Sequence, residues 1–255
     1  MKKTLLFAAA LLTGASLSAQ VSFSDDFESY TVGDYIGVVS PDWTTWSGAT
    51  GGAEDVQVGT AQASSGTNSI YFIDGSGSGG PQDVVLPFGG AYDNGMFDIS
   101  LDLYVVSGKN AYFNLQAETT IGTTWALDVD FEAGGDVVVR SGTDGTYCTT
   151  TYTQNQWHTF SLTINLNTNC WEAFLDGGSI GTFSNTNNKV ASLDLYPIAS
   201  SEFYVDDVSF NYTPYTLLAT NAAPAGTDMI GSIAGSNVYP TVDVKNLGTN
   251  TITSY

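Results

Sequence analysis

The chain has 255 residues, of which 26 are acidic and 6 are basic, and its formal net charge is −20. Proteins that bind nucleic acid need a basic surface for the phosphate backbone, so this composition argues against nucleic acid as a partner. Two cysteines without close spacing and a single histidine argue against a zinc site. The acidity fits either a well-solvated exterior or carboxylates that hold a hard cation such as calcium.

The first 19 residues have the three parts of a secretory signal peptide. Lys2 and Lys3 precede the apolar run Leu5–Leu12, and small residues follow at 16–19. We expect cleavage near Ala19 and a mature chain that is secreted or lies on the outer cell surface. No later run approaches the roughly 18 apolar residues of a spanning helix, so we expect no transmembrane segment in the mature chain.

Alternating apolar and polar residues recur between residues 20 and 212, with the two-residue period of a strand that has one buried face. Breaks rich in glycine, asparagine, aspartate and serine separate them, and the Gly/Ser tract at 75–80 is expected to form a flexible hairpin tip. Many short strands with turns between them predict an all-β fold, a jelly-roll β-sandwich of two antiparallel sheets over 20–212. The clearest alternations lie at 97–105, 125–131, 160–164 and 203–210.

The composition shifts at Asn211–Pro214, and the strand pattern resumes only at 239–245. We therefore expect a domain boundary near residue 213. About 40 residues are close to the lower limit for a chain that buries a core by itself. Residues 213–255 are accordingly expected to be a linker and a truncated second β domain.

The segment Gln156–Asn165, followed by Cys170–Gly177, resembles the signature hairpin of laminin-G-like and concanavalin-A-like jelly rolls. An aromatic-led strand passes through an Asn-rich turn into a second strand that ends at Asp-Gly. Two further motifs, at 25–30 and 203–208, resemble the opening and closing strands of bacterial carbohydrate-binding jelly rolls. The resemblance covers 21–212 and implies a lectin-like fold.

The same resemblance implies that the two ends of the sandwich lie side by side and share a structural calcium ion. The residues carried over as ligands are Asp26, Glu28 and Asp207, with Asp206 as a further candidate. Calcium takes about six to eight oxygen ligands, so backbone carbonyls or waters would complete the shell. The alternative is that these acids lie on a surface close to turns and bind no ion.

The tail at 242–252 resembles the first half of an immunoglobulin-like domain of the bacterial cell-adhesion type. Such stretches recur in multidomain surface proteins of the Bacteroidetes, many of them exported by the type IX route. The resemblance implies the outer surface or the medium of a Gram-negative bacterium, and further domains in the same polypeptide.

Asp128, Asp130 and Glu132 alternate along one predicted strand, so their side chains are expected on one face. They resemble the acidic triplet of jelly-roll glucanases, which would make the chain a glycoside hydrolase. The resemblance is incomplete, because the first position of that triplet is a glutamate. The alternative is an acidic strand that faces solvent or a cation. His158, the one imidazole, lies inside the predicted hairpin and is expected to be structural.

Aromatic residues are candidate contacts for a sugar, whose ring face is flat and apolar. Trp43 and Trp46 lie in a loop-like stretch with Tyr30 and Tyr35 nearby, and they are expected either to bind a ligand or to pack under the edge of the sandwich. The remaining tryptophans lie within strand patterns and are expected in the core: Trp125, Trp157 and Trp171.

Cys148 and Cys170 are a candidate disulfide, since an exported protein meets an oxidising environment. The sequence as a whole favours a non-catalytic binding module, with a glycan or a cell-surface polymer as its partner. Two alternatives remain open at this point. One is a jelly-roll glycoside hydrolase, and the other is a structural spacer in a large surface adhesin.

Overall fold

A computed structural model describes residues 20–215, 222–228 and 241–246. The contacts divide them into one compact unit that ends at Pro214 and a second unit, and each is described by itself. In the second unit, β16 (Ala222–Asp228) and β17 (Thr241–Asn246) pair antiparallel. The predicted signal peptide lies outside the described residues, and the immunoglobulin-like identity of the tail stays a prediction.

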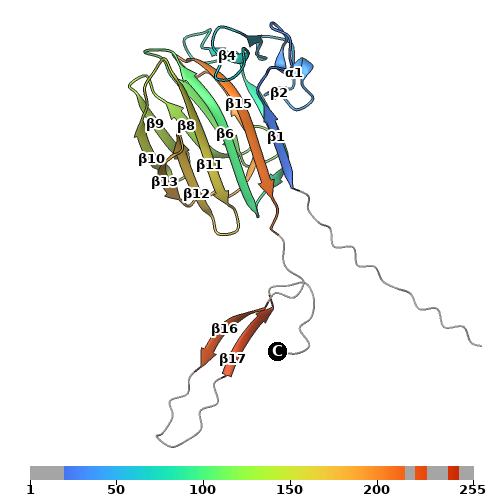
Figure 1. Cartoon of the computed structure of the whole chain (residues 1–255), viewed down its shortest axis with the longest axis vertical. Coiled ribbons are helices and arrows are strands. Elements are labelled where there is room, and N and C mark those ends of the chain that lie inside the picture. Colours follow the sequence, from blue (N-terminus) through green and yellow to red (C-terminus); the bar gives the residue numbers. More distant parts are fainter. Residues whose placement is uncertain (1–19, 216–221, 229–240, 247–255) are drawn as a thin grey trace, which may run out of the picture. The chain divides into compact units, whose positions relative to one another are not determined.

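The larger unit is a sandwich of two antiparallel sheets, as the alternating patterns predict (Figure 1). One sheet has eight strands: β1 (Val21–Asp25), β3 (Val58–Gly59), β4 (Ser69–Ile73), β6 (Met96–Val105), β11 (Trp157–Asn165), β12 (Cys170–Leu175), β13 (Gly178–Phe183) and β15 (Glu202–Thr213). Their order is β13-β12-β11-β6-β15-β4-β3, and β1 pairs with the second half of β15.

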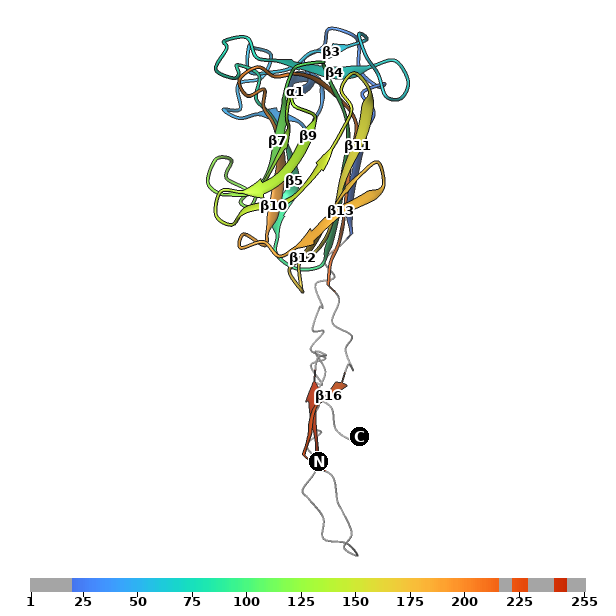
Figure 2. The ribbon, with the colours of Figure 1, turned by 90° about the vertical axis from the view of Figure 1, so that its left-hand side faces the viewer.

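The other sheet has seven strands in the order β10-β9-β8-β7-β14-β5-β2. They are β2 (Thr44–Thr45), β5 (Val84–Tyr92), β7 (Ala111–Gln116), β8 (Trp125–Phe131), β9 (Asp136–Ser141), β10 (Gly145–Thr151) and β14 (Val190–Leu195). A helix of four residues, α1 (Ile36–Val39), lies at one end of the sandwich (Figure 1). Figure 2 shows the two sheets as separate layers, with β11 and β13 in one and β7 and β9 in the other.

The chain crosses between the sheets repeatedly, since β5 and β14 lie in one sheet and their successors β6 and β15 in the other. Strands that are neighbours in space are therefore often distant in sequence, as β14 is from β5 and β7. Side chains from four or five separate segments consequently meet on one face.

The core lies between the sheets and is rich in aromatic rings. Phe113 of β7 and Phe160 of β11 meet edge to face, with ring centroids 5.4 Å apart. Phe88 of β5 lies 4.8 Å from Phe97 of β6 and 4.7 Å from Phe210 of β15. Each of these rings is nearly or fully buried and joins one sheet to the other. Burial of such apolar surface is the main stabilising contribution to the sandwich.

The predicted hairpin is confirmed. β11 and β12 pair from Phe160–Leu175 to Asn165–Cys170, and Asp176 and Gly177 form the turn that follows. Both turn residues have positive φ angles, of 50° and 76°. An Asp-Gly pair is well suited to such a turn.

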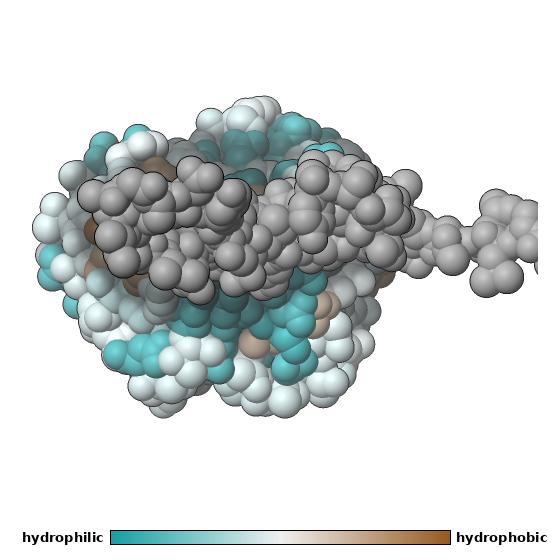
Figure 3. Space-filling model, turned by 90° about the horizontal axis from the view of Figure 1, so that it is seen from below, coloured by the Kyte–Doolittle hydropathy of each residue, from teal (hydrophilic) through white to brown (hydrophobic). Residues whose placement is uncertain are grey.

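In the view of Figure 3, residues of intermediate hydropathy (white) and hydrophilic residues (teal) make up most of the described surface, and hydrophobic residues are scattered. Few large hydrophobic side chains of the described residues are exposed, among them Val32, Val38 and Trp125. No helix in the part of the chain that the structure describes is long and apolar enough to span a membrane.

The two cysteines are free thiols in the structure, which does not join them as the expected disulfide. Cys148 of β10 packs against Gly181 of β13, where an added Cβ atom would lie 2.7 Å from the Cys148 Cβ. Gly181 pairs with Ala173 of β12, three positions along the strand from Cys170. Three residues of strand span about 10 Å, which exceeds the Cα separation of about 7 Å that a disulfide can bridge.

Candidate functional site

A row of polar side chains crosses the outer face of the seven-stranded sheet. Arg140 of β9 lies opposite Asp128 of β8, which lies opposite Asn114 of β7, which in turn lies opposite Asp194 of β14. Their neighbours along each strand, such as Leu127 and Val129, point into the core. The two-residue period of the strands therefore separates an apolar inner face from this polar outer row.

The row is buried except at Arg140, although it lies on an outer face. Six of the seven residues of β8 and all six of β14 are buried, so both faces of these strands are covered. Asn114 and Asp194 are almost inaccessible, and Asp194 is only 3% exposed. Buried polar groups need partners, so the contacts of each group determine what the site can do.

Arg140 holds two carboxylates at one end of the row. Its Nε donates to Asp130 Oδ2 at 2.8 Å, and its Nη1 lies 3.4 Å from Asp128 Oδ2. The Tyr112 hydroxyl donates to the other oxygen of Asp128 at 2.6 Å. Burial raises the pKa of Asp130, and Arg140 opposes that effect. Burial and the bond to Asp128 raise the pKa of Tyr112 well above its usual value, so its hydroxyl remains protonated.

Asp83 and Asp194 form a pair of carboxyl groups at the other end. The Asn114 side chain donates to Asp194 Oδ2, and Gln116 Nε2 donates to the side-chain oxygen Oδ1 of Asn114, which fixes this part of the row. The Oδ1 atoms of Asp83 and Asp194 are buried and receive no hydrogen bond from the protein. Burial, followed by the charge of Asp194, raises the pKa of Asp83, and burial also raises that of Asp194. A proton held between the two carboxyls would let one donate to the other.

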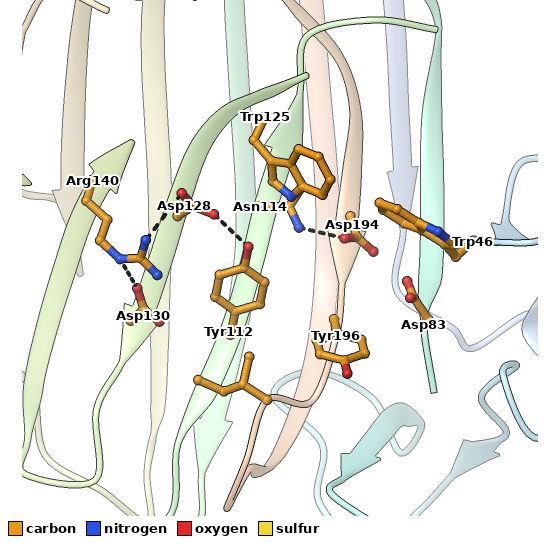
Figure 4. A pocket seen from close by; sticks show the side chains of 11 residues that line it. Trp46, Asp83, Tyr112, Asn114, Trp125, Asp128, Asp130, Arg140, Asp194 and Tyr196 are labelled. Carbon is orange, nitrogen blue, oxygen red and sulfur yellow. Dashed lines mark hydrogen bonds and ion pairs between the residues drawn. The ribbon is translucent and has the colours of Figure 1, made fainter. Parts of the chain in front are cut away.

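These groups line a pocket of about 570 Å³ (Figure 4). Its walls are aromatic, because Trp46, Trp125, Tyr112 and Tyr196 all border it. The rings of Trp46 and Trp125 contact each other, with centroids 5.8 Å apart and planes 35° apart. Trp125 is 38% exposed, so part of its ring faces solvent. The pocket thus combines an apolar wall with a polar floor.

Glycines in two loops allow these aromatic walls to approach. Gly122 has a φ angle of +77°, and an added Cβ atom would lie 2.7 Å from the Trp46 ring. Gly79 has a φ of +101°, and its Cβ would lie 2.8 Å from the hydroxyl oxygen of Tyr196. Asp74 accepts backbone hydrogen bonds from residues 76, 77 and 79, so the tract expected as a flexible tip is folded around this carboxylate beside the pocket wall.

The predicted aromatic contacts divide between two places. Trp46 lines the pocket, whereas Trp43 is 3% exposed, packs against Phe23 and Phe27, and donates to Asp25 Oδ2 at 3.0 Å. Of the two alternatives expected for Trp43, the structure has packing and not ligand contact, because the ring is enclosed by the sandwich edge.

Tyr30 and Tyr35 are half-buried and are not among the residues that line this pocket. The Tyr30 hydroxyl donates to Asp25 Oδ2 at 2.9 Å, and Tyr35 forms a strand bridge with Gln57. Their partners are therefore groups of the sandwich edge. Among the tryptophans expected in the core, Trp171 is buried and Trp157 is half-buried, whereas Trp125 is exposed.

The structure brings two of the three residues of the acidic triplet together. Asp128 and Asp130 both line the pocket, but β8 ends at Phe131 and Glu132 is exposed beyond it. The amide of Glu132 donates to Asp136 O, and the amide of Gly135 donates back to Glu132 O, which closes the hairpin. Glu132 therefore lies in a turn and not on the face shared by the other two acids.

The candidate calcium ligands lie near the paired ends of the sandwich, and Asp26 and Asp207 border one shallow pocket. Glu28 already accepts hydrogen bonds from the amides of Thr67 and Asn68, at 2.7 and 2.6 Å. Asp206 is buried, and its carboxylate accepts backbone bonds that include the amide of Ser64. In the described residues, no group of three or more acidic, histidine or cysteine side chains is arranged to hold a metal ion, and calcium stays a prediction.

His158 is buried on the other sheet, away from the polar row. Its Nδ1 lies 2.7 Å from Asp176 Oδ2, and its Nε2 lies 2.8 Å from Thr153 O. Both ring nitrogens therefore have partners within the hairpin and the loop before it.

Most of the pocket residues carry no recognisable motif in the sequence. These residues come from four separate segments: Asp83 precedes β5, Tyr112 and Asn114 lie on β7, Arg140 lies on β9 and Asp194 on β14. The pairing of β7, β8, β9 and β14 brings the last four together. One local signal exists: a single aspartate interrupts the otherwise apolar end of β14, Leu193–Leu195.

No family model and no curated protein matches the chain. Among solved structures, the globular domain of T. cruzi calreticulin is similar, with a TM-score of 0.51 and 12% identity over 75% of this chain and 87% of that chain. The metal-free carbohydrate recognition domain of Emp46p matches with a TM-score of 0.45 and 12% identity, over 73% of this chain and 97% of that one.

An alginate lyase of polysaccharide lyase family 7 matches with a TM-score of 0.44 and 8% identity, over 62% of this chain and 82% of that one. At identities this low, a likeness concerns the fold alone. The chain is thus similar to the calreticulin globular domain in its fold.

Proposed function

We propose that the chain is a carbohydrate-binding module and that its site is the pocket on the outer face of the seven-stranded sheet. The observation that carries the proposal is the contact pair of Trp46 and Trp125 beside a buried polar row. A sugar ring has a flat apolar face and an edge of hydroxyl groups. The indole rings suit the face, and the carboxylates and amide suit the hydroxyls.

The fixed geometry of the polar row supports this proposal. Asp128 is held by Arg140 and Tyr112, and Asn114 is held between Asp194 and Gln116. Side chains that are already ordered lose little conformational entropy when a ligand binds. The pocket volume of about 570 Å³ also lies in the range of small-molecule sites.

Binding without catalysis fits the same contacts. Asp128 and Asp130 share one arginine, and Glu132 lies in the turn beyond their strand. A retaining or inverting glycosidase needs two carboxyl groups free to act on opposite sides of the scissile bond. A glycoside hydrolase that uses Asp128, Asp130 and Glu132 is therefore a weaker proposal than a binding module.

We further propose that the module acts outside the cell, on a glycan or a cell-surface polymer, as one domain of an exported polypeptide. The signal-like first 19 residues and the resemblance of the tail to adhesion domains support this location. The spacer alternative predicts that the pocket binds no sugar.

A glycan array probed with the whole 255-residue chain tests the proposed function. We expect at least one class of glycan to bind, and Trp46→Ala to weaken that binding. Absence of binding to every glycan would contradict the proposal and favour the spacer. Release of reducing sugar from a bound glycan would instead favour the hydrolase.

A further inference from the structure

The carboxyl pair of Asp83 and Asp194 is the least satisfied part of the pocket. Both side chains line it, and the buried Oδ1 atom of each receives no donor from the protein unless the pair itself holds a proton. A buried acceptor without a donor costs free energy, and the cost is larger when the group is charged. A ligand that donates to both oxygens would remove this cost.

The charges around the pair are unbalanced. Four aspartates line the pocket, and among the described residues that border it Arg140 is the one cationic side chain. Its guanidinium is already engaged by Asp128 and Asp130. An anionic sugar would therefore meet carboxylates without a free cation to pair with.

From these contacts we infer that the pocket binds a sugar that carries a protonated primary amine, with the ammonium group seated between Asp83 and Asp194. This inference rests on the proposed carbohydrate-binding function and names the class of ligand. An ammonium group has three donors and no acceptor, so it can serve both Oδ1 atoms at once. A sugar hydroxyl has one donor and brings no positive charge.

Two further features favour a cationic ligand over a neutral one. The aromatic walls attract a cation, because each ring has a negative face. The net charge of −20 also attracts a polycationic glycan before contact is made. A partly deacetylated amino-sugar polymer carries both a cationic group for the pocket and many positive charges along its chain.

The test compares two probes of equal length and linkage, a hexamer of β-1,4-linked glucosamine and its fully N-acetylated form. Titration calorimetry near neutral pH measures both with the whole chain, because an acidic pH would protonate both carboxyls of the pair and remove the charge that the ammonium group pairs with. We expect the amine form to bind at least tenfold more tightly. Asp83→Asn and Asp194→Asn should lower this ratio of affinities towards one.

Asp98→Asn is the matched control, because it makes the same side-chain substitution on the other sheet. We expect it to leave the ratio unchanged, which separates the pair from long-range attraction. Circular dichroism checks that each variant is folded.

Equal or tighter binding of the N-acetylated hexamer, or of any neutral or anionic glycan on the array, would overturn the inference and leave the proposed function standing. An unchanged ratio in both pocket variants would also overturn it. Failure of every glycan to bind would overturn the proposed function and this inference together.

Discussion

The outer faces of the two sheets both carry aromatic rings, but they arrange them differently. On the eight-stranded sheet, Tyr71, Tyr204, Tyr104 and Trp157 lie side by side on neighbouring strands, with centroids 4.6, 5.9 and 5.7 Å apart. Rings in such a row cover one another. On the seven-stranded sheet, the rings stand around a polar floor and form a pocket.

Polar residues also differ between the two outer faces, in how deeply they are buried. Ser100 and Ser161 lie opposite each other on the eight-stranded sheet and are half-buried, as their short side chains allow. Asp128 and Asn114 lie opposite each other on the seven-stranded sheet and are buried. The comparison teaches that alternation alone places residues on an outer face, while the loops above that face determine whether it becomes a site.

Arg140→Gln should have the largest effect on stability. It leaves Asp128 and Asp130 buried without a cation, and hydrogen bonds to charged groups contribute about 1.5–3 kcal/mol each. We expect a loss of about 2–3 kcal/mol in urea unfolding. The control is Lys109→Gln, since Lys109 pairs with Glu202 near the surface and should contribute at most about 1 kcal/mol. Equal losses of unfolding free energy in the two variants would contradict the claim that Arg140 holds buried carboxylates while Lys109 forms a surface ion pair.

Trp125→Ala should have the largest effect on glycan binding. It removes the exposed half of the tryptophan pair, so we expect at least a tenfold loss of affinity, or about 1.4 kcal/mol. Trp157→Ala removes an aromatic ring from the other face and should change affinity less than twofold. Calorimetry measures both affinities. A larger loss in the Trp157 variant would place the site on the eight-stranded sheet and contradict the proposed pocket.

Asp83→Asn should alter the pH dependence of stability. Burial and Asp194 raise the pKa of Asp83, so the folded protein holds a proton that the unfolded chain releases above its ordinary pKa of about 4. The free energy of unfolding of the native chain therefore falls as pH rises through the raised pKa.

The Asp83→Asn variant should lose part of this slope and gain stability at neutral pH, on the order of 1 kcal/mol. Burial also raises the pKa of Asp206 to about 6, with the same sign, but this contribution is common to both proteins and cancels in the comparison. Urea unfolding from about pH 4 to about pH 9, the range between the ordinary and the raised pKa of Asp83, measures the slopes. If the free energy of unfolding depended on pH in the same way in the variant and the native chain, Asp83 would not be the source of the slope.

Calcium should have the smallest effect. If Asp26 and Asp207 contribute to an ion site, saturating calcium should raise the melting temperature by about 3 °C, because the ion binds only the folded chain. Asp207→Asn should remove the rise, while Asp194→Asn should preserve it. A melting temperature that does not change at millimolar calcium would end the calcium prediction.

The sandwich could be predicted because its signal is local. The alternation at 97–105 and 125–131 corresponds to β6 and β8, and the predicted hairpin corresponds to β11 and β12. The same period also placed Asp128 and Asp130 on one face. It could not show that β8 ends before Glu132, because the hairpin contacts with Asp136 determine that end.

The pocket could not be predicted because it depends on contacts between distant segments. Asp83 and Asp194 meet only through the pairing of β5 with β14. Trp43 and Trp46 are three residues apart in the same stretch, yet one packs within the sandwich edge and the other lines the pocket. The two tryptophans have nearly the same local sequence, and only tertiary packing gives them different surroundings.

Amide hydrogen exchange of the whole chain, with and without a saturating bound oligosaccharide, tests the central claim most directly. Binding in the pocket should slow exchange in β7, β8 and the loop that carries Trp46, and should leave β6 and β11 of the other sheet unchanged. Protection centred on β6, β11 and the row of Tyr104 and Trp157 would contradict the account.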